Sequence, residues 1–434
     1  MVEWRSICPP HRGRRSSGCN GSILPPSRPN GLSQSSENQG VALMARQWKA
    51  IVIGAGGSQA QAMLRGIARA GATEGWLAID RAWRPQARAA TEELGFAVQE
   101  LNPLAQPETL RKLLESTSLV VNMAGPYYKT GFAILDAAIE RKTDYIDICD
   151  DADITLPMLE RDARAKESGI AALIGMGSSP GTTNILIRSA VDHLGPVDDV
   201  DIYWTVDVAD LTEAAIRHFW HCFNLVDADG TIHEVTGWAG LERRQVDFPA
   251  PVGLQSVVRL AHPEPLTVPR FLPVKRASNF GGLNPEEALV TAWALAHIAD
   301  EQRSGGEFTD PAASLFRHYR ERRVGAPRIG SGMIIDVHTA GSGLRFAAGS
   351  DGGMDDSTGI PAAAGALLML EGKINRRGAF APEVVSPADF FETLRRVSTG
   401  GGGLSLFRLE GGVATERLRI RDLVAGDLSQ REVA

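Results

Sequence analysis

A glycine-rich turn with the spacing of a phosphate cradle follows the first apolar run of the chain. The run Lys49–Ile53 has the composition of a strand, and it ends in Gly54-Ala55-Gly56-Gly57. A helical pattern follows at once, so the first glycine permits a tight turn and the second lets the backbone approach a pyrophosphate at the helix N-terminus. Gln59 stands where the third glycine of G-x-G-x-x-G is usual. We expect this turn to bind a dinucleotide through Gly54, Gly56, Gly57, Ser58 and Gln59.

An acidic residue closes the next predicted strand, Trp76–Ile79. At this position the carboxylate of Asp80 accepts hydrogen bonds from the adenosine ribose and repels a 2′-phosphate, which favours NAD over NADP. Arg81 and Arg84 follow directly. A guanidinium beside the ribose accommodates that phosphate, so NADP remains the alternative cofactor.

Further candidates follow the fourth predicted strand, Leu119–Met123. Ligands bind beyond the carboxyl ends of parallel strands, and four residues at this end are expected to line the cofactor: Asn122, Ala124, Gly125 and Pro126. Tyr127, Tyr128 and Lys129 come next as catalytic candidates, because both residue types can donate or accept a proton. The alternative is a plain strand-to-helix turn, with one tyrosine packed inside and the lysine solvated.

A second turn, Ser179-Pro180-Gly181-Thr182, precedes a helical pattern. Its backbone N–H groups are expected to hold a substrate carboxylate, with Asn184 fixing the loop. Arg345 is a candidate carboxylate clamp, because its guanidinium matches a carboxylate in shape and charge. A surface arginine on a strand is the alternative.

These candidates depend on a repeated unit of apolar run, turn and helical pattern between Trp48 and about Leu194. Six runs read as strands: Lys49–Ile53, Trp76–Ile79, Phe96–Leu101, Leu119–Met123, Tyr145–Cys149 and Ile170–Gly175. Strands buried on both faces and alternating with helices predict an α/β fold with a doubly wound parallel Rossmann sheet. After about Val197 the runs alternate in polarity and lack regular helices, which predicts a second α+β domain with a mainly antiparallel sheet for the substrate.

The predicted organisation has five parts: a disordered extension (1–45), the Rossmann domain (46–195), the substrate domain (196–355), a helical region returning to the Rossmann domain (356–397) and a loose tail (398–434). The extension is rich in Pro, Ser, Gly, Asn and Arg, a composition that does not form a core. We expect Met44 to be the natural start.

Several motifs together resemble the saccharopine dehydrogenase family. They are Val120–Tyr128, Tyr145-Ile146-Asp147, Gly177–Asn184, Thr358–Ala362, Glu371-Gly372-Lys373 and Pro382-Glu383, in the order the family has them. The resemblance implies an NAD(P)-dependent oxidoreductase that acts at a C–N bond of an amino acid or its imine adduct, and a homodimer. Ser179 stands where saccharopine-forming members tend to carry an acidic residue, which disfavours a straightforward saccharopine activity.

Chemistry at a C–N bond needs a group that moves a proton near the nitrogen, while the hydride belongs to the cofactor. Asp147 lies near the end of the fifth predicted strand and is the best such candidate in the sequence. The neighbouring Asp150 or Asp151 can instead cap the helix that follows. Cys149 reads as a buried packing residue rather than a nucleophile.

The composition of the chain limits the kinds of molecule that the protein is expected to bind. The net charge of −7 over 434 residues offers no basic surface for nucleic acid or anionic membrane, and no apolar run approaches the roughly 18 residues that span a bilayer. The four cysteines and the histidines lack metal-ligand spacing, so we expect no metal and a cytoplasmic protein acting on a small amino-acid-like substrate. Two alternatives stay open: reduction of a carbonyl or C=C bond in a secondary metabolite, and a catalytically silent dinucleotide-binding protein.

Overall fold

The computed structural model describes residues 47–211, 215–216, 219, 222–226, 232–234, 241–301, 310–323, 325–400, 403–426 and 428. The predicted disordered extension and Met44 lie outside these residues. Within them, no helix is long and apolar enough to cross a membrane.

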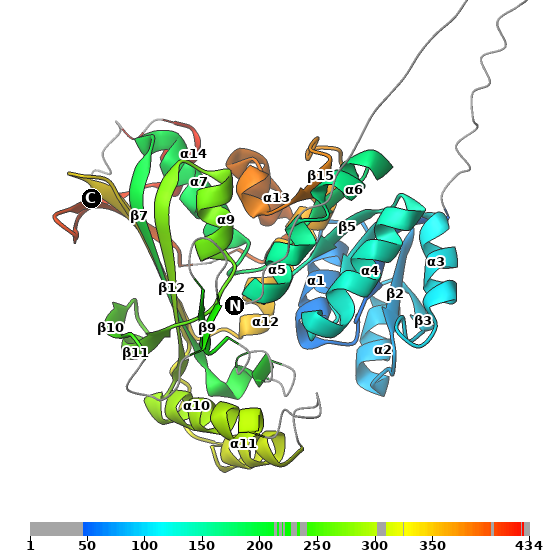
Figure 1. Cartoon of the computed structure of the whole chain (residues 1–434), viewed down its shortest axis with the longest axis horizontal. Coiled ribbons are helices and arrows are strands. Elements are labelled where there is room, and N and C mark those ends of the chain that lie inside the picture. Colours follow the sequence, from blue (N-terminus) through cyan, green and yellow to red (C-terminus); the bar gives the residue numbers. More distant parts are fainter. Residues whose placement is uncertain are drawn as a thin grey trace, which may run out of the picture. The chain divides into compact units, whose positions relative to one another are not determined.

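The N-terminal half forms the predicted parallel sheet (Figure 1). Its strands are β1 (Trp48–Ile53), β2 (Trp76–Asp80), β3 (Ala97–Glu100), β4 (Thr117–Asn122), β5 (Asp144–Asp147), β6 (Ala171–Leu173) and β15 (Gly378–Phe380). The order β15-β6-β5-β4-β1-β2-β3 contains the Rossmann order 3-2-1-4-5-6. All neighbouring pairs are parallel. The predicted α/β class is confirmed.

Helices alternate with these strands and bury the apolar faces that the sequence pattern indicates. They are α1 (Ser58–Arg69), α2 (Pro85–Glu93), α3 (Pro107–Glu115), α4 (Tyr127–Arg141), α5 (Ala152–Leu159) and α6 (Asp162–Ser168). The inner strands β1 and β4 are buried along almost their whole length, as expected of a sheet that is covered on both faces.

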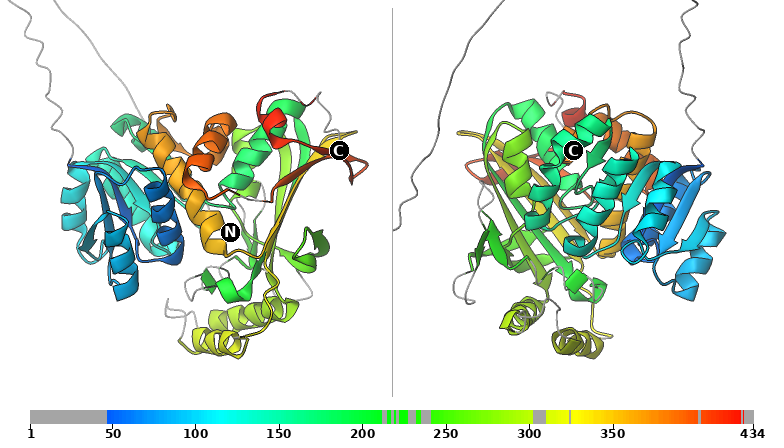
Figure 2. Two further views of the ribbon diagram at one scale, coloured as in Figure 1. Left: turned by 180° about the vertical axis from the view of Figure 1, so that it is seen from behind. Right: turned by 45° about the vertical axis from the view of Figure 1, so that its right-hand side comes forward.

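A later part of the chain completes this half. Strand β15 pairs with β6, and the helix α12 (Met354–Leu370) lies against α1 (Figure 2). Gly359 of α12 and Gly66 of α1 allow this close approach, since a Cβ on Gly66 would come within 3.1 Å of Ile360 and one on Gly359 would overlap the backbone of α1. The helix α13 (Pro387–Val397) adds Phe390 and Val397 to the same core.

The second sheet has eight strands in the order β10-β11-β12-β7-β13-β14-β16-β17. They are β7 (Val197–Asp207), β10 (Arg243–Phe248), β11 (Gly253–Arg259), β12 (Val274–Asn284), β13 (Ser331–His338), β14 (Gly343–Ser350), β16 (Ser405–Glu410) and β17 (Val413–Leu418). Only β12 and β7 run parallel among these pairs, so the prediction of a mainly antiparallel second sheet is confirmed.

Helices cover one face of this sheet. The helix α7 (Thr182–Leu194) packs Leu186, Ile187 and Ala190 against the strands. The helices α9 (Glu264–Phe271), α10 (Glu286–Glu301) and α11 (Asp310–Arg322) also belong to this half, together with a small hairpin of β8 (Asn224–Val226) and β9 (Ile232–Glu234).

The end of the chain differs from the expected loose tail. Strands β16 and β17 extend the eight-stranded sheet beyond β14, and α14 (Ile420–Val424) follows them. Leu406, Leu418 and Leu423 are buried in the same core as α7. The glycine run near residue 400 is therefore a connection between two ordered parts, and burial of these leucines holds the end of the chain in place.

Candidate functional site

The predicted dinucleotide turn lies between β1 and α1, at the carboxyl edge of the parallel sheet. Gly54 has φ +80°, and a Cβ there would lie 2.8 Å from the Cα of Ala124 in the loop after β4. The loops after β1 and β4 therefore touch. The first N–H groups of α1 have no partners within the helix and point toward this edge. The close backbone approach and the free helix start fit a bound pyrophosphate.

Asp80 and Arg84 both hold the backbone of this turn. The N–H of Gly56 donates to Oδ2 of Asp80 at 2.8 Å, and Nη2 of Arg84 donates to the Gly56 oxygen at 2.7 Å. The other Asp80 oxygen accepts from the Ala82 N–H at 3.1 Å. Arg81 is exposed. Of the two arginines, Arg81 is thus the one left to meet a 2′-phosphate.

Gln59 replaces the usual third glycine without widening the turn. Its backbone oxygen lies against Gly359 of α12, and Ser58 donates its hydroxyl to Asp355 at 2.6 Å. The close contact that a third glycine normally makes with the sheet is made here between α1 and the start of α12. The two halves of this contact are 297 residues apart in sequence.

Asp147 lies at the end of β5, but its side chain points inward. Its side chain is fully buried; Oδ2 accepts from the Tyr145 hydroxyl at 2.7 Å, and Oδ1 accepts from the N–H groups of Cys149 and Gly175 at 3.0 and 2.7 Å. Burial raises the pKa of Asp147 to about 6, against these hydrogen bonds. Asp147 therefore joins the ends of β5 and β6, and we withdraw its assignment as the group that meets substrate.

Asn122 and Tyr127 belong to the same buried group. Asn122 donates to the Tyr145 hydroxyl at 3.2 Å and accepts from the Ala124 N–H at 3.1 Å. Tyr127 donates its hydroxyl to the Asn122 backbone oxygen at 3.0 Å, and burial raises its pKa well above the usual value. Both side chains shape the loop beneath the cofactor edge instead of reaching over it.

The rest of this loop is accessible. Gly125 and Lys129 are exposed, while Pro126 and Tyr128 are half-buried. The Lys129 ammonium lies 5.9 Å from the centre of the Tyr128 ring. Of the predicted catalytic candidates, Tyr128 and Lys129 are the two that a ligand can reach.

The turn after β6 uses its own backbone donors. The N–H groups of Gly177, Thr182 and Thr183 donate to oxygens within the turn at 2.9, 2.9 and 3.0 Å. The Gly181 N–H donates to Oδ1 of Asn184 at 2.7 Å, so Asn184 bonds the backbone of the loop. With these four donors occupied, binding of a substrate carboxylate by the backbone of this turn stays a prediction.

The same turn instead presents side chains to a buried carboxylate that the sequence analysis missed. Glu264, at the start of α9, is fully buried and accepts from four groups. Ser179 and Thr183 donate to Oε1, while His262 Nδ1 and Asn279 Nδ2 lie 2.6 and 3.2 Å from Oε2. Burial alone would raise the pKa of Glu264, but the His262 charge and the hydrogen bonds from His262 and Ser179 outweigh it and lower the pKa.

A second buried carboxyl lies behind Asn184. Glu383, in the short helix η4 (Pro382–Val384), accepts from Asn184 Nδ2 at 2.7 Å and also bonds Thr267. Its Oε2 has no partner among the described residues. Burial is the main cause that raises the pKa of Glu383 to about 7.

Contacts link these two centres to the nucleotide turn. Gly177 lies close to Thr358 of α12, since a Cβ on Gly177 would be 3.2 Å from the Thr358 side chain. The start of the same helix accepts a hydrogen bond from Ser58. The glycine-rich turn, the start of α12 and the Ser179 turn thus form one continuous region. Arg345 is not part of it, because its guanidinium pairs with Asp336 through two 2.6 Å bonds on the sheet face opposite α7.

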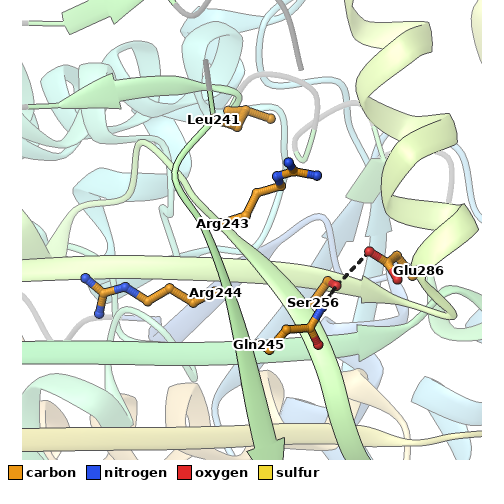
Figure 3. A pocket seen from close by; sticks show the side chains of 6 residues that line it. All are labelled: Leu241, Arg243, Arg244, Gln245, Ser256 and Glu286. Atoms are coloured by element: carbon orange, nitrogen blue, oxygen red, sulfur yellow. Dashed lines mark hydrogen bonds between the residues drawn. The ribbon is translucent and has the colours of Figure 1, made fainter. Parts of the chain in front are cut away.

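A shallow hollow of ≈ 380 Å³ lies elsewhere, between β10, β11 and α10 (Figure 3). Gln245, Ser256 and Glu286 point toward one another there and are hydrogen-bonded, while Arg244 points away. None of the residues predicted for the site lines this hollow, so it is a less suitable candidate than the region around Ser179.

The sequence signal for the missed pair was weak but present. His262-Pro263-Glu264 directly follows the mainly apolar run Val257–Ala261. In the first half of the chain, polar residues in the same position after an apolar run were chosen as site candidates. His218 and His221 lie outside the described residues.

Comparison with known proteins also supports a dinucleotide-binding domain in the first half of the chain. Residues 50–173 match the saccharopine dehydrogenase NADP binding domain family. Carboxyaminopropylagmatine dehydrogenase of Synechocystis sp. is 22% identical over 320 residues, covering 65% of this chain and 79% of the relative. Carboxynorspermidine synthase of Vibrio cholerae is 23% identical over 342 residues, covering 68% and 79%.

Two solved structures share the fold. Saccharopine dehydrogenase (L-Glu forming) of Saccharomyces cerevisiae aligns with a TM-score of 0.54 at 14% identity, covering 83% of this chain and 100% of that chain. Homospermidine synthase of Legionella pneumophila, in complex with NAD, aligns with a TM-score of 0.54 at 10% identity, covering 85% and 92%. With the nucleotide turn, these findings show an NAD(P)-binding domain of the saccharopine dehydrogenase type at residues 50–173, in a chain similar to NAD(P)-dependent oxidoreductases.

Proposed function

We propose that the protein transfers a hydride at the C–N bond of a secondary amine or imine formed from an amine and a carboxyl-bearing carbonyl compound. The relatives carboxyaminopropylagmatine dehydrogenase and carboxynorspermidine synthase are named after carboxylated polyamine-type molecules of this kind. Bound NAD(P)H would supply the hydride. The observation that carries the proposal is the continuous region joining the nucleotide turn, through Ser58 and Asp355, to the Ser179 turn and Glu264.

The two sheets have separate tasks in this proposal. The parallel sheet of 46–195 would hold the cofactor through Gly54, Gly56, Gly57, Ser58 and Gln59, with Ala124, Gly125 and Pro126 along its other side and the buried Asn122 supporting that loop. The second sheet would hold the amine. Tyr128, Lys129 and the half-exposed Ser179 are the residues on the cofactor side that a substrate can touch.

Wild-type protein mixed with NAD(P)H and pairs of a diamine with a 2-oxoacid or an aldehyde acid tests the proposal. We expect nicotinamide absorbance to fall only when both partners are present, with a secondary amine found by mass spectrometry. Oxidation of NAD(P)H by a carbonyl or alkene compound without an amine would favour the alternative activity, reduction of a carbonyl or C=C bond. Cofactor binding without turnover on any pair would favour the silent binding protein.

We further propose NAD over NADP, because Asp80 places a carboxylate beside the ribose position. Nicotinamide fluorescence titration should give a lower Kd for NADH than for NADPH. Replacing Arg81 by Ala should weaken NADPH further and leave NADH unchanged, because Arg81 is exposed and outside the turn's own hydrogen bonds. A wild type that prefers NADPH would contradict the assignment of Asp80.

Cytoplasmic location and a homodimer are also proposals. The buried thiol of Cys149, which forms no disulfide, supports a reducing compartment. Cell fractionation and light scattering of the purified protein test the two points separately.

A further inference from the structure

The buried pair His262 and Glu264 is the most fully built polar group of the second sheet. Both side chains are almost completely enclosed, at 3% and 0% exposure. Glu264 accepts from four donors: Ser179 just before α7, Thr183 at the start of α7, His262 just before α9, and Asn279 on β12. A carboxylate that is buried and satisfied in this way stays ionised and fixed in position.

This carboxylate determines how His262 is held. His262 Nδ1 lies 2.6 Å from Oε2 of Glu264, so the proton of the neutral ring is on Nδ1 and Nε2 is the nitrogen that can accept another. Within the described part of the chain, no residue hydrogen-bonds Nε2. The imidazole is thus oriented by one nitrogen and open to proton transfer at the other.

Two half-exposed residues connect the imidazole to the outside. The Trp204 ring lies 5.8 Å from the His262 ring, and its Nε1 donates to Oδ1 of Asn279 at 2.7 Å. Ser179 shares the Glu264 carboxylate and belongs to the turn that reaches α12 and the nucleotide turn. A molecule bound over Ser179 and Trp204 would be beside His262.

We propose that His262 gives and takes the proton at the substrate nitrogen, with Glu264 as its positioning residue. The inference rests on the proposed function and deepens it. In the reducing direction, Nε2–H of His262 protonates the imine nitrogen, the hydride from the cofactor adds to the imine carbon, and the C=N double bond becomes a C–N single bond. The imine is reduced, NAD(P)H is oxidised, and a proton from solvent restores His262. The reverse steps serve amine oxidation.

The other titratable groups of this region are less suited to the task. Asp147 is enclosed by three donors below the cofactor edge. Glu383 bonds Asn184 and lies behind the turn. Lys129 is exposed at the start of α4, and no acidic side chain positions its ammonium group in the way that Glu264 positions His262 among the contacts of the described residues.

The first test is kinetic. His262→Asn should lower kcat by about 10²–10⁴-fold, the usual contribution of a general acid–base group, while the Kd of NADH stays within about twofold of wild type. Glu264→Gln keeps the imidazole but loses the charge that orients it, so its loss should fall mainly on kcat rather than KM. His338→Asn, on β13 away from this cluster, is the control and should behave as wild type.

The second test needs no turnover. In wild-type protein labelled with ¹⁵N-histidine, the His262 ring should be protonated at Nδ1 when neutral, and Glu264→Gln should shift this signal. Assignment comes from the spectrum of His262→Asn, or of Glu264→Gln if the first variant does not fold.

The outcomes separate the two proposals. A wild type without turnover on any amine–carbonyl pair refutes the proposed function and this step with it. A wild type that turns over imines, with His262→Asn retaining kcat within threefold and binding NADH normally, overturns this inference alone. A neutral ring protonated at Nε2 with Nδ1 bare overturns the orientation by Glu264.

Discussion

Replacing Glu383 by Gln should stabilise the protein at alkaline pH and do so less in acid. The folded protein raises the pKa of Glu383 from its ordinary 4.5 to about 7, chiefly by burial. Because the folded-state pKa lies above the unfolded one, the folded state binds the proton more tightly. The resulting stabilisation is fully present below pH 4.5 and is lost as the pH rises through 7.

The magnitude follows from the size of this shift. Each pKa unit corresponds to about 1.4 kcal/mol. Compared with a side chain that is always neutral, the raised pKa of Glu383 therefore lowers the free energy of unfolding by about 3 kcal/mol at pH 8 and about 1 kcal/mol at pH 5. Glutamine keeps the shape and the oxygen that accepts from Asn184, and it is neutral throughout. The gain from Glu383→Gln should therefore grow by about 2 kcal/mol between these two pH values.

Thermal unfolding of both proteins at pH 5, 6, 7 and 8 measures this difference. The melting temperature of Glu383→Gln should exceed that of wild type by a few degrees at pH 8 and by much less at pH 5. Glu100→Gln, at an exposed position on β3, is the matched control and should show no such trend. A Glu383→Gln difference that does not change with pH would refute the reasoning, since it would mean that Glu383 is not ionised at cost in the folded state.

Two further substitutions test the contacts around the site. Gly359→Ala places a Cβ 2.7 Å from both Ala62 Cβ and Met63 N. This overpacking should lower the free energy of unfolding by about 1–3 kcal/mol. Gly341→Ala is the control and should be neutral in the same thermal assay, because nothing lies within 4 Å of a Cβ there. Arg345→Ala leaves the buried Asp336 unpaired and should lower stability by about 2–4 kcal/mol, while kcat/KM stays at the wild-type value; a tenfold rise in KM would return Arg345 to the substrate site.

The cofactor side of the protein was predictable because its signals are local. Gly54 and Gly56 lie directly after β1, and Asp80 ends the neighbouring strand β2, so their meeting depends on short-range geometry. The hydrogen bond from Gly56 to Asp80 shows how directly the spacing translates into structure. The parallel sheet follows from the same kind of signal, since its strands read as short and mainly apolar runs.

The second sheet was less predictable because its central strand carries few apolar signals. Strand β12 contains Ser278, Asn279, Gly281 and Gly282, a composition that reads as a loop. The glycines are there because Trp204 lies over Gly281, where a Cβ would overlap the indole. Packing against a distant residue, not local propensity, makes this segment a strand.

The inward direction of the Asp147 side chain was not predictable for a related reason. A carboxylate at a strand end can point toward a ligand or back into the loops that follow, and the sequence does not distinguish the two. Here the Gly175 N–H, 28 residues further on, captures Oδ1. The partners of Glu264 are still more remote, since Ser179 is 85 residues away, so their meeting is a result of the tertiary fold.

The two buried carboxyls of the site are joined through the adjacent side chains of Thr183 and Asn184, which couples their charge states. Asn184 donates to Glu383 and accepts from the Gly181 N–H, and Thr183 donates to both Asn184 and Glu264. Glu264 has four donors, one of them a histidine, so it stays ionised; Glu383 has fewer donors and an unpartnered oxygen among the described residues, so it favours its proton. Because like charges that share a network oppose each other's ionisation, a protonated Glu383 helps Glu264 remain the charged partner of His262.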